Sequence, residues 1–161
     1  MLDSYIKYFN KFSNKKLFIW LWFFIIIITL TISKLMEYID IDFGVESMDI
    51  EKEGMVKMIG YGVIIGPVIE TFIFTFLPYK LLSRIIKNDT LIIIIASLLF
   101  GISHFYSLMY IIYGVILGLI LNTYYVYLLK KNNNTLTAFG LVTLLHASTN
   151  LTSLFLEYFF S

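Results

Sequence analysis

The sequence contains no cysteine, which excludes disulfide bonds, thiolate metal sites and a cysteine nucleophile. Charged residues are also scarce: they make up only 14% of the 161 residues, whereas a soluble domain carries roughly 25%. The formal net charge is only +1, and nearly all of the charged residues lie outside the apolar runs. The chain therefore offers no electropositive footprint for nucleic acid, and no nucleic-acid partner is expected.

Apolar residues dominate what remains, because 59% of the chain belongs to the set of Ala, Val, Ile, Leu, Met, Phe, Trp, Tyr and Cys. Such a surface needs lipid to cover it, and a helix that spans a bilayer takes about 20 apolar residues. This predicts an all-α, multi-pass protein of the cell membrane, a bundle of about five transmembrane helices. The predicted spans are Leu17–Ser33, Met58–Tyr79, Thr90–Tyr106, Leu108–Leu129 and Leu136–Phe160. The third is short and closely followed by the fourth, so an incomplete crossing by one of them remains open.

Composition divides the chain into three parts. Residues 1–16 form a basic segment, interpreted as an interfacial helix with a frayed tail as the equal alternative. Residues 17–57 hold the first transmembrane helix and an acidic outer loop, and residues 58–161 form the remaining membrane core. If the spans alternate in direction, one side of the membrane carries nine basic residues: Lys7, Lys11, Lys15, Lys16, Lys80, Arg84, Lys87, Lys130 and Lys131. The other side carries three, which predicts a cytoplasmic N-terminus and an external C-terminus.

Two patterns in the fourth span concern packing. Gly114 and Gly118 form a small-xxx-small motif, which predicts close helix contact within the monomer rather than a dimer interface. Tyr124, Tyr125 and Tyr127 lie near the inner end of the same span and are typical of an aromatic belt at the membrane surface.

Ionisable residues inside spans are the strongest indication of function. Each acidic side chain costs roughly 2.5–3.5 kcal/mol at the centre of an inserted helix. Glu70 lies well inside the second span, and both histidines, His104 and His146, also fall in spans. Counted at about 1.5 Å per residue, these three residues and Asn150 lie at similar depths. His146 and Asn150 are four residues apart and share a helix face. We therefore expect one shared polar site, the alternative being isolated helix–helix hydrogen bonds.

Several chemistries lack their residues here. No span contains the paired Asp of an aspartyl protease, and the zinc-binding H-E-x-x-H pattern is absent. Ser103 is adjacent to His104 and would point about 100° away from it on a helix, so a packing role is favoured. Two possibilities remain: Glu and His that activate a water molecule, or Glu70, His104 and His146 that bind a metal ion.

Three motifs in order carry a family resemblance. They are Glu70-Thr71-Phe72-Ile73-Phe74-Thr75, preceded by Pro67, then Phe100-Gly101-Ile102-Ser103-His104, and His146-Ala147-Ser148-Thr149-Asn150. From about Met58 to Phe160 the chain resembles the CAAX-protease and bacteriocin-processing (CPBP, or Abi) family of intramembrane proteases, whose pattern is E-E-x-x-x-R, F-x-x-x-H and H-x-x-x-N or H-x-x-x-D. Thr71 and Thr75 replace the second Glu and the Arg. Those two positions have the i,i+4 spacing of a helical ion pair, so losing both leaves no unpaired charge.

The resemblance implies an endopeptidase that hydrolyses a peptide bond of a peptide or protein substrate at the lipid bilayer. Glu70 and His104 would activate the attacking water, and His146 and Asn150 would donate hydrogen bonds to the oxyanion. No cofactor is implied, and zinc held by Glu70, His104 and His146 is the alternative. The altered first motif keeps a second hypothesis open, namely a catalytically impaired member that acts as a bacteriocin self-immunity or membrane binding protein.

Overall fold

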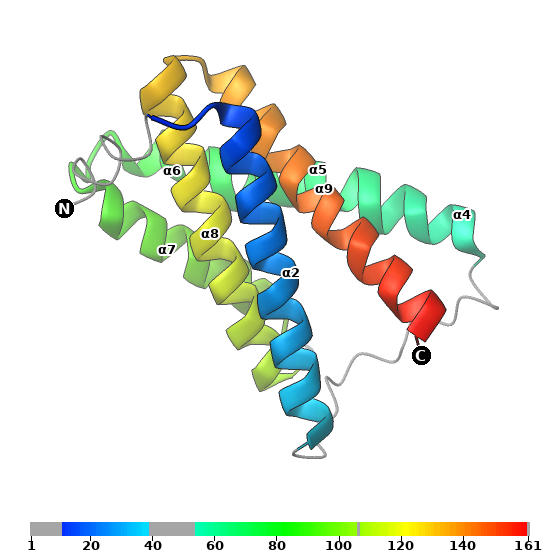
Figure 1. Cartoon of the computed structure of the whole chain (residues 1–161). Helices are drawn as coiled ribbons and strands as arrows, with labels where there is room; N and C mark the ends of the chain where they lie inside the picture. The colour runs from blue at the N-terminus through cyan, green and yellow to red at the C-terminus, as the bar shows by residue number, and fades with distance from the viewer. Residues whose placement is uncertain (1–10, 39–53, 106, 161) are drawn as a thin grey trace.

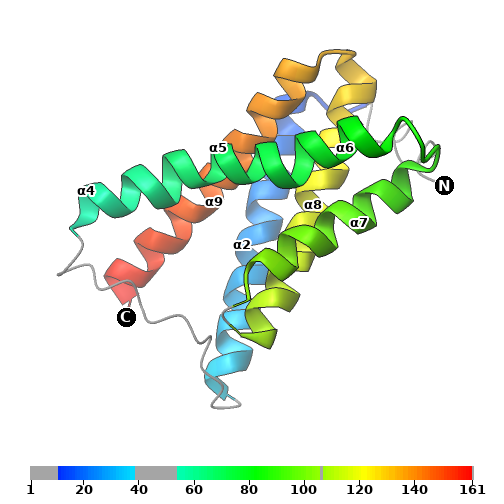
Figure 2. The ribbon, with the colours of Figure 1, turned by 180° about the vertical axis from the view of Figure 1, so that it is seen from behind.

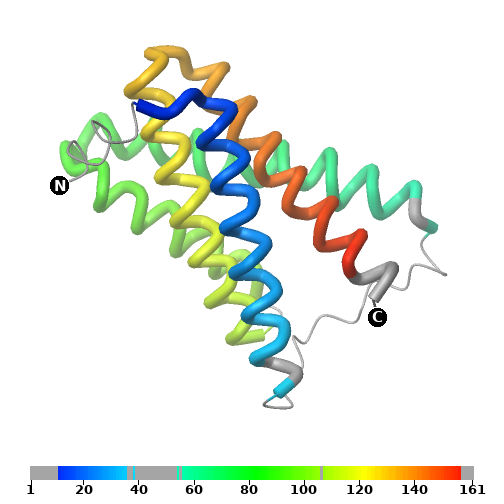
Figure 3. The backbone as a smooth tube through the Cα atoms, viewed as in Figure 1, coloured from blue at the N-terminus to red at the C-terminus, as the bar shows by residue number. Residues whose placement is uncertain are grey.

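The computed structural model describes residues 11–38, 54–105 and 107–160, and none of these is in a strand (Figure 1). The elements are α2 (Asn14–Tyr38), α4 (Met55–Met58), the π-helix η1 (Ile59–Ile65), α5 (Gly66–Thr71), the π-helix η2 (Phe72–Phe76), α6 (Leu77–Leu82), α7 (Asp89–Ser103), α8 (Leu108–Asn132) and α9 (Thr135–Phe160). The pieces from α4 to α6 follow one another as a single long helix (Figure 3). The predicted all-α membrane bundle is therefore confirmed.

Four helices in the described part of the chain are long and apolar enough to cross a membrane. They cover Asn14–Leu35, Val56–Leu82, Leu108–Asn132 and Thr135–Leu156. Helix α7 has 15 residues, about 22 Å, and is shorter than the roughly 30 Å of a hydrocarbon core, as its sequence predicted. The predicted interfacial helix over 1–16 and the acidic outer loop fall largely on residues 1–10 and 39–53, which lie outside the described residues.

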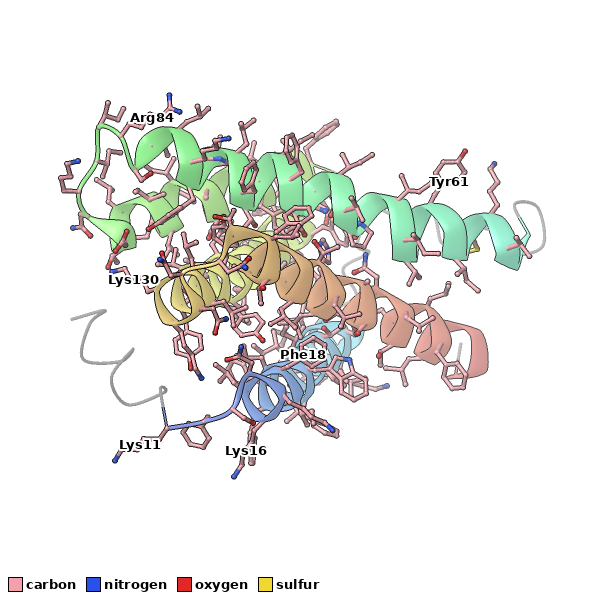
Figure 4. All side chains as sticks on the ribbon, turned by 90° about the horizontal axis from the view of Figure 1, so that it is seen from above. Lys11, Lys16, Phe18, Tyr61, Arg84 and Lys130 are labelled. Atoms are coloured by element: carbon pink, nitrogen blue, oxygen red, sulfur yellow. The ribbon has the colours of Figure 1, made fainter. Side chains whose placement is uncertain are left out.

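Polar contacts join the helix ends on the basic side of the bundle. The Lys131 ammonium donates to the carbonyl oxygen of Phe12 at 2.6 Å. The Tyr79 hydroxyl donates to Asp89 at 2.9 Å, and Asp89 also forms an ion pair with Lys130. Figure 4 looks down onto this end and labels Lys16 of α2, Arg84 of the turn between α6 and α7, and Lys130 of α8. The basic residues of three separate segments thus lie at one end of the molecule, which fits the charge asymmetry behind the predicted topology.

Helices α7 and α8 lie against each other (Figure 2), and they pack closely because small residues face one another. A Cβ atom added to Gly118 would lie 3.0 Å from the Cα atom of Ser97, and one added to Gly114 would lie 3.0 Å from the Cα atom of Gly101. The contact predicted for the small-xxx-small motif is therefore confirmed as one within the monomer.

The predicted aromatic belt is wrong. Tyr124, Tyr125 and Tyr127 expose only 2%, 2% and 5% of their surfaces and belong to the core. The reason is tertiary: α8 packs against α2, α7, α9 and η2, and the three tyrosines lie where these neighbours cover the helix.

Each π-helix in the long second helix ends just before a proline. A proline ring clashes with the carbonyl four residues earlier and has no N–H to donate. Before Pro67, the N–H of Gly66 reaches back five residues to the carbonyl of Tyr61, which is the wider π spacing. The same change of spacing precedes Pro78. The helix therefore passes both prolines without breaking, and its α5 section crosses α9 obliquely (Figures 1 and 2).

Candidate active site

Glu70 and His146 meet where α5 crosses α9. The Oε2 atom of Glu70 lies 3.4 Å from the Nε2 atom of His146. The His146 side chain is 3% exposed and that of Glu70 is 31% exposed, so the imidazole is enclosed while the carboxylate remains partly accessible. Two residues 76 positions apart in the sequence thus form a pair inside the bundle. The expected convergence of Glu70 with a histidine from another span is present in the structure.

His104 directly follows the last residue of helix α7, and its ring is held by the backbone. Its Nδ1 atom lies 2.8 Å from the carbonyl oxygen of Phe100 and 3.2 Å from the Ser103 hydroxyl. A carbonyl oxygen only accepts hydrogen bonds, so the neutral ring carries its proton on Nδ1 and has its lone pair on Nε2. A lone pair at that atom suits His104 to accept a proton or to orient a water molecule.

The sequence placed Ser103 and His104 on one helix, pointing about 100° apart, but only Ser103 belongs to the helix. Helix α7 ends at Ser103, and His104 has φ −98° and ψ 52°, outside the helical region. The 100° separation holds only for neighbours that are both helical. The Ser103 hydroxyl donates to the Phe100 carbonyl at 2.7 Å and so helps to hold the end of the helix.

The Phe100 ring lies between the two histidines. Its centroid is 4.7 Å from that of His104 and 5.7 Å from that of His146, and the residue is only 3% exposed. Phe100 thus connects the two histidine rings, and His146 in turn contacts Glu70. The Tyr110 ring, 5.5 Å from the His104 ring, completes this side of the site. No motif in the sequence indicated Tyr110, because an aromatic residue at the start of a span has many structural uses.

Asn150 shares the α9 face of His146, but its contact is with the Glu70 helix. Its Nδ2 atom donates to the carbonyl oxygen of Gly62 at 2.9 Å. The amide nitrogen carries two hydrogens, so one N–H remains for another acceptor. The sequence could not indicate Gly62 as the acceptor, because every residue has a backbone carbonyl.

The two positions at which the first motif departs from the family pattern face the protein interior. Thr71 is 2% exposed and Thr75 is 3% exposed. Among the described residues, the Thr71 hydroxyl has no hydrogen-bond partner. An apolar side chain of the same shape should therefore stabilise the fold about as well as Thr71 does.

The zinc alternative requires Glu70, His104 and His146 to share one ion. Over the described ranges, no three His, Asp or Glu side chains are grouped in a way that would hold a metal. The arrangement does not fit a three-ligand site, and we assign no step to a metal.

Comparison with known proteins gives a family match over most of this core. A family model described as Type II CAAX prenyl endopeptidase Rce1-like matches residues 52–152. The matched region includes Glu70, His104, His146 and Asn150. Searches of curated proteins and of solved structures found no match.

Proposed function

The chain belongs to the Rce1-like type II CAAX prenyl endopeptidase family, and from this premise we propose that it cleaves a peptide bond of a membrane-associated substrate with water activated at Glu70 and His104. The observation that carries the proposal is the 3.4 Å contact between Glu70 and His146, made by separate helices inside the bundle. Ionisable groups are costly in a membrane, and a carboxylate paired with an imidazole is a common acid–base arrangement.

In the proposed first step, a water molecule lies between the Glu70 carboxylate and Nε2 of His104. Glu70 takes one proton of the water as its oxygen attacks the substrate carbonyl carbon, which forms the new C–O bond. His104 accepts a hydrogen bond from the same water and orients it, because its Nδ1 proton is engaged by Phe100. A positioned base of this kind contributes about 10²–10⁴ in rate.

In the proposed second step, the oxyanion accepts hydrogen bonds from Nε2–H of His146 and from the remaining N–H of Asn150. Each such donor commonly contributes about 10²–10³ in rate. Glu70 then returns its proton to the nitrogen of the leaving amine as the C–N bond breaks. The products are a carboxylic acid and an amine, with one water consumed.

A second candidate function rests on Thr71 and Thr75. They stand where the family pattern has Glu and Arg, and both are buried. A chain that kept the fold but lost turnover would bind its peptide without cleaving it, as a bacteriocin self-immunity or membrane binding protein. In this function Glu70 would hold the ligand, and its loss would affect binding rather than hydrolysis.

The test uses purified full-length protein in lipid nanodiscs and two internally quenched fluorogenic peptides. One ends in a farnesylated cysteine followed by three residues, and the other has no prenyl group and is anchored by a palmitoyl chain. The wild type is expected to cleave at least one of them, and Glu70→Gln to lower kcat/KM by about 10²–10⁴. Thr71→Val is the matched control, because it changes the neighbouring residue and removes only a hydroxyl without a hydrogen-bond partner among the described residues.

The outcomes separate the two functions. Cleavage by the wild type that survives in Glu70→Gln would rule out Glu70 as the base. If the wild type binds but cleaves neither peptide, the binding function is favoured. Metal analysis of the same preparation tests the zinc alternative independently of turnover.

A further inference from the structure

Pro67 leaves one carbonyl of the Glu70 helix without its backbone donor. In η1 the N–H of Gly66 bonds to the carbonyl of Tyr61, five residues earlier. The next bond of this series would run from residue 67 to the carbonyl of Gly62, but proline has no N–H. The N–H of Gly66 is therefore already used by Tyr61, and residue 67 has no N–H to offer. The Gly62 carbonyl has to accept its hydrogen bond from another part of the chain.

That partner comes from α9. Nδ2 of Asn150 donates to the Gly62 carbonyl at 2.9 Å, across 88 residues of sequence. Water does not reach the interior of a bilayer freely, so a carbonyl without a donor there is costly. The Asn150 amide therefore supplies the hydrogen bond that Pro67 removes.

We propose that Asn150 is a positioning residue, which replaces the missing N–H of Pro67 and holds the proline-bearing Glu70 helix against the face of α9 that carries His146. On α9, His146 precedes Asn150 by four residues, about one helical turn. On the other helix, Glu70 follows Gly62 by eight residues, about two turns, with Pro67 between them. The bond keeps the two groups at their 3.4 Å separation. Its effect on catalysis rests on the proposed peptidase function, but the bond itself does not.

The direct test is a double-mutant cycle in thermal unfolding of the full-length protein. Asn150→Ala is expected to lower Tm by about 2–4 °C or more, because it leaves the Gly62 carbonyl without a partner. Pro67→Ala restores a backbone N–H that can bond within the helix. In that background Asn150→Ala should lower Tm by less than half as much. A general loss of packing at Asn150 would instead add to the effect of Pro67→Ala.

Two matched controls make the coupling specific. Pro78 also follows a π-helix, so Pro78→Ala should leave the cost of Asn150→Ala unchanged. Asn122 is a buried asparagine whose Nδ2 donates to the carbonyl of Gly118. Asn122→Ala should lower Tm by the same amount with and without Pro67→Ala. The proposal would be overturned if Asn150→Ala lowered Tm equally in the Pro67→Ala and Pro78→Ala backgrounds.

The positioning itself can be measured by spin labelling, because the chain has no native cysteine. Cysteines introduced at Val56 and Leu151, both exposed, place one label on α4 and one on α9. We expect a narrow distance distribution in the otherwise unaltered protein, a broader one with Asn150→Ala, and narrowing again when Pro67→Ala is added. An unchanged distribution in Asn150→Ala would contradict the positioning role.

Activity and folding give separate answers. If Asn150→Ala does not fold, recovery of folded protein in Asn150→Ala/Pro67→Ala is the expected result, and its absence counts against the proposal. If the wild type cleaves no peptide, the proposed function fails while the Tm coupling and the label distances still decide the role of Asn150. With an active enzyme, Pro67→Ala should restore part of the stability lost in Asn150→Ala but not the oxyanion donor, so kcat stays low.

Discussion

Nε2 of His146 lies 3.4 Å from Oε2 of Glu70, and this contact joins the two helices that carry the first and the last motif. The separation exceeds the roughly 2.7–2.9 Å of a short charge-assisted hydrogen bond, so the pair is close without being tightly locked. A base held in this way can release its partner when it takes a proton from water.

Glu70→Gln and His146→Ala should not have multiplicative effects on kcat/KM. Residues that act as a unit lose the same function whichever one is removed, so the double variant should be no worse than about the more severe single variant. Thr71→Val combined with His146→Ala provides the comparison, because Thr71 has no contact with the reacting groups in the proposed mechanism. Losses that multiply in Glu70→Gln/His146→Ala would show that the two residues work independently.

His104→Ala should lower kcat by about 10²–10⁴, whereas Ser103→Ala should change it little. The difference follows from the hydrogen bonds, because the Phe100 carbonyl still holds Nδ1 of His104 when the Ser103 hydroxyl is removed. Turnover of the fluorogenic peptide by variants matched in membrane level measures both. A large loss in Ser103→Ala would mean that the hydroxyl, rather than the carbonyl, sets the histidine tautomer.

Gly66→Ala should reduce both stability and activity, and Gly60→Ala should not. A Cβ atom on Gly66 would lie 2.8 Å from the carbonyl oxygen of Tyr61, so the junction between η1 and α5 has to shift just ahead of Glu70. A Cβ atom on Gly60 meets nothing within 4 Å. Thermal unfolding and peptide turnover are compared for the two variants. Equal behaviour would mean that the π-helix junction tolerates a side chain.

Gly101→Ala should destabilise the bundle by about 1–3 kcal/mol, the usual range for overpacking. Its Cβ atom would lie 2.7 Å from the backbone nitrogen of Val115 and 2.8 Å from the carbonyl oxygen of Ile111, and backbone atoms cannot rotate away. Gly140→Ala is the control, because its Cβ atom meets nothing within 4 Å and alanine favours a helix by roughly 0.5–1 kcal/mol over glycine. Tm should therefore fall in Gly101→Ala and stay the same or rise in Gly140→Ala.

Reporter fusions should place Lys131 in the cytoplasm and Ser161 outside. The expectation rests on the basic end of the bundle, where Lys131 contacts the start of the first helix through the Phe12 carbonyl. An alkaline phosphatase fusion is active outside and a green fluorescent protein fusion is fluorescent inside, so each site is tested with both. Matching cytoplasmic signals at Lys131 and Ser161 would contradict a full crossing by α9.

The sequence by itself determined the membrane setting, the helical class and the family. A bilayer forces backbone groups to bond within each span, so apolar length alone identifies the helices. The helical period likewise determined that His146 and Asn150 share a face, and the ordered motifs indicated the family that residues 52–152 match.

Only the tertiary structure decided which groups meet. Periodicity states which face of a helix a residue occupies but not which helix lies opposite, so the pairing of Glu70 with His146 depended on the crossing of α5 and α9. The same limit explains the burial of Tyr124 and its neighbours, because surrounding helices cover α8. The bond from Asn150 to Gly62 was beyond sequence reasoning for a further reason: its acceptor is a backbone carbonyl, which becomes distinctive only once the π-helix and Pro67 leave it without a donor.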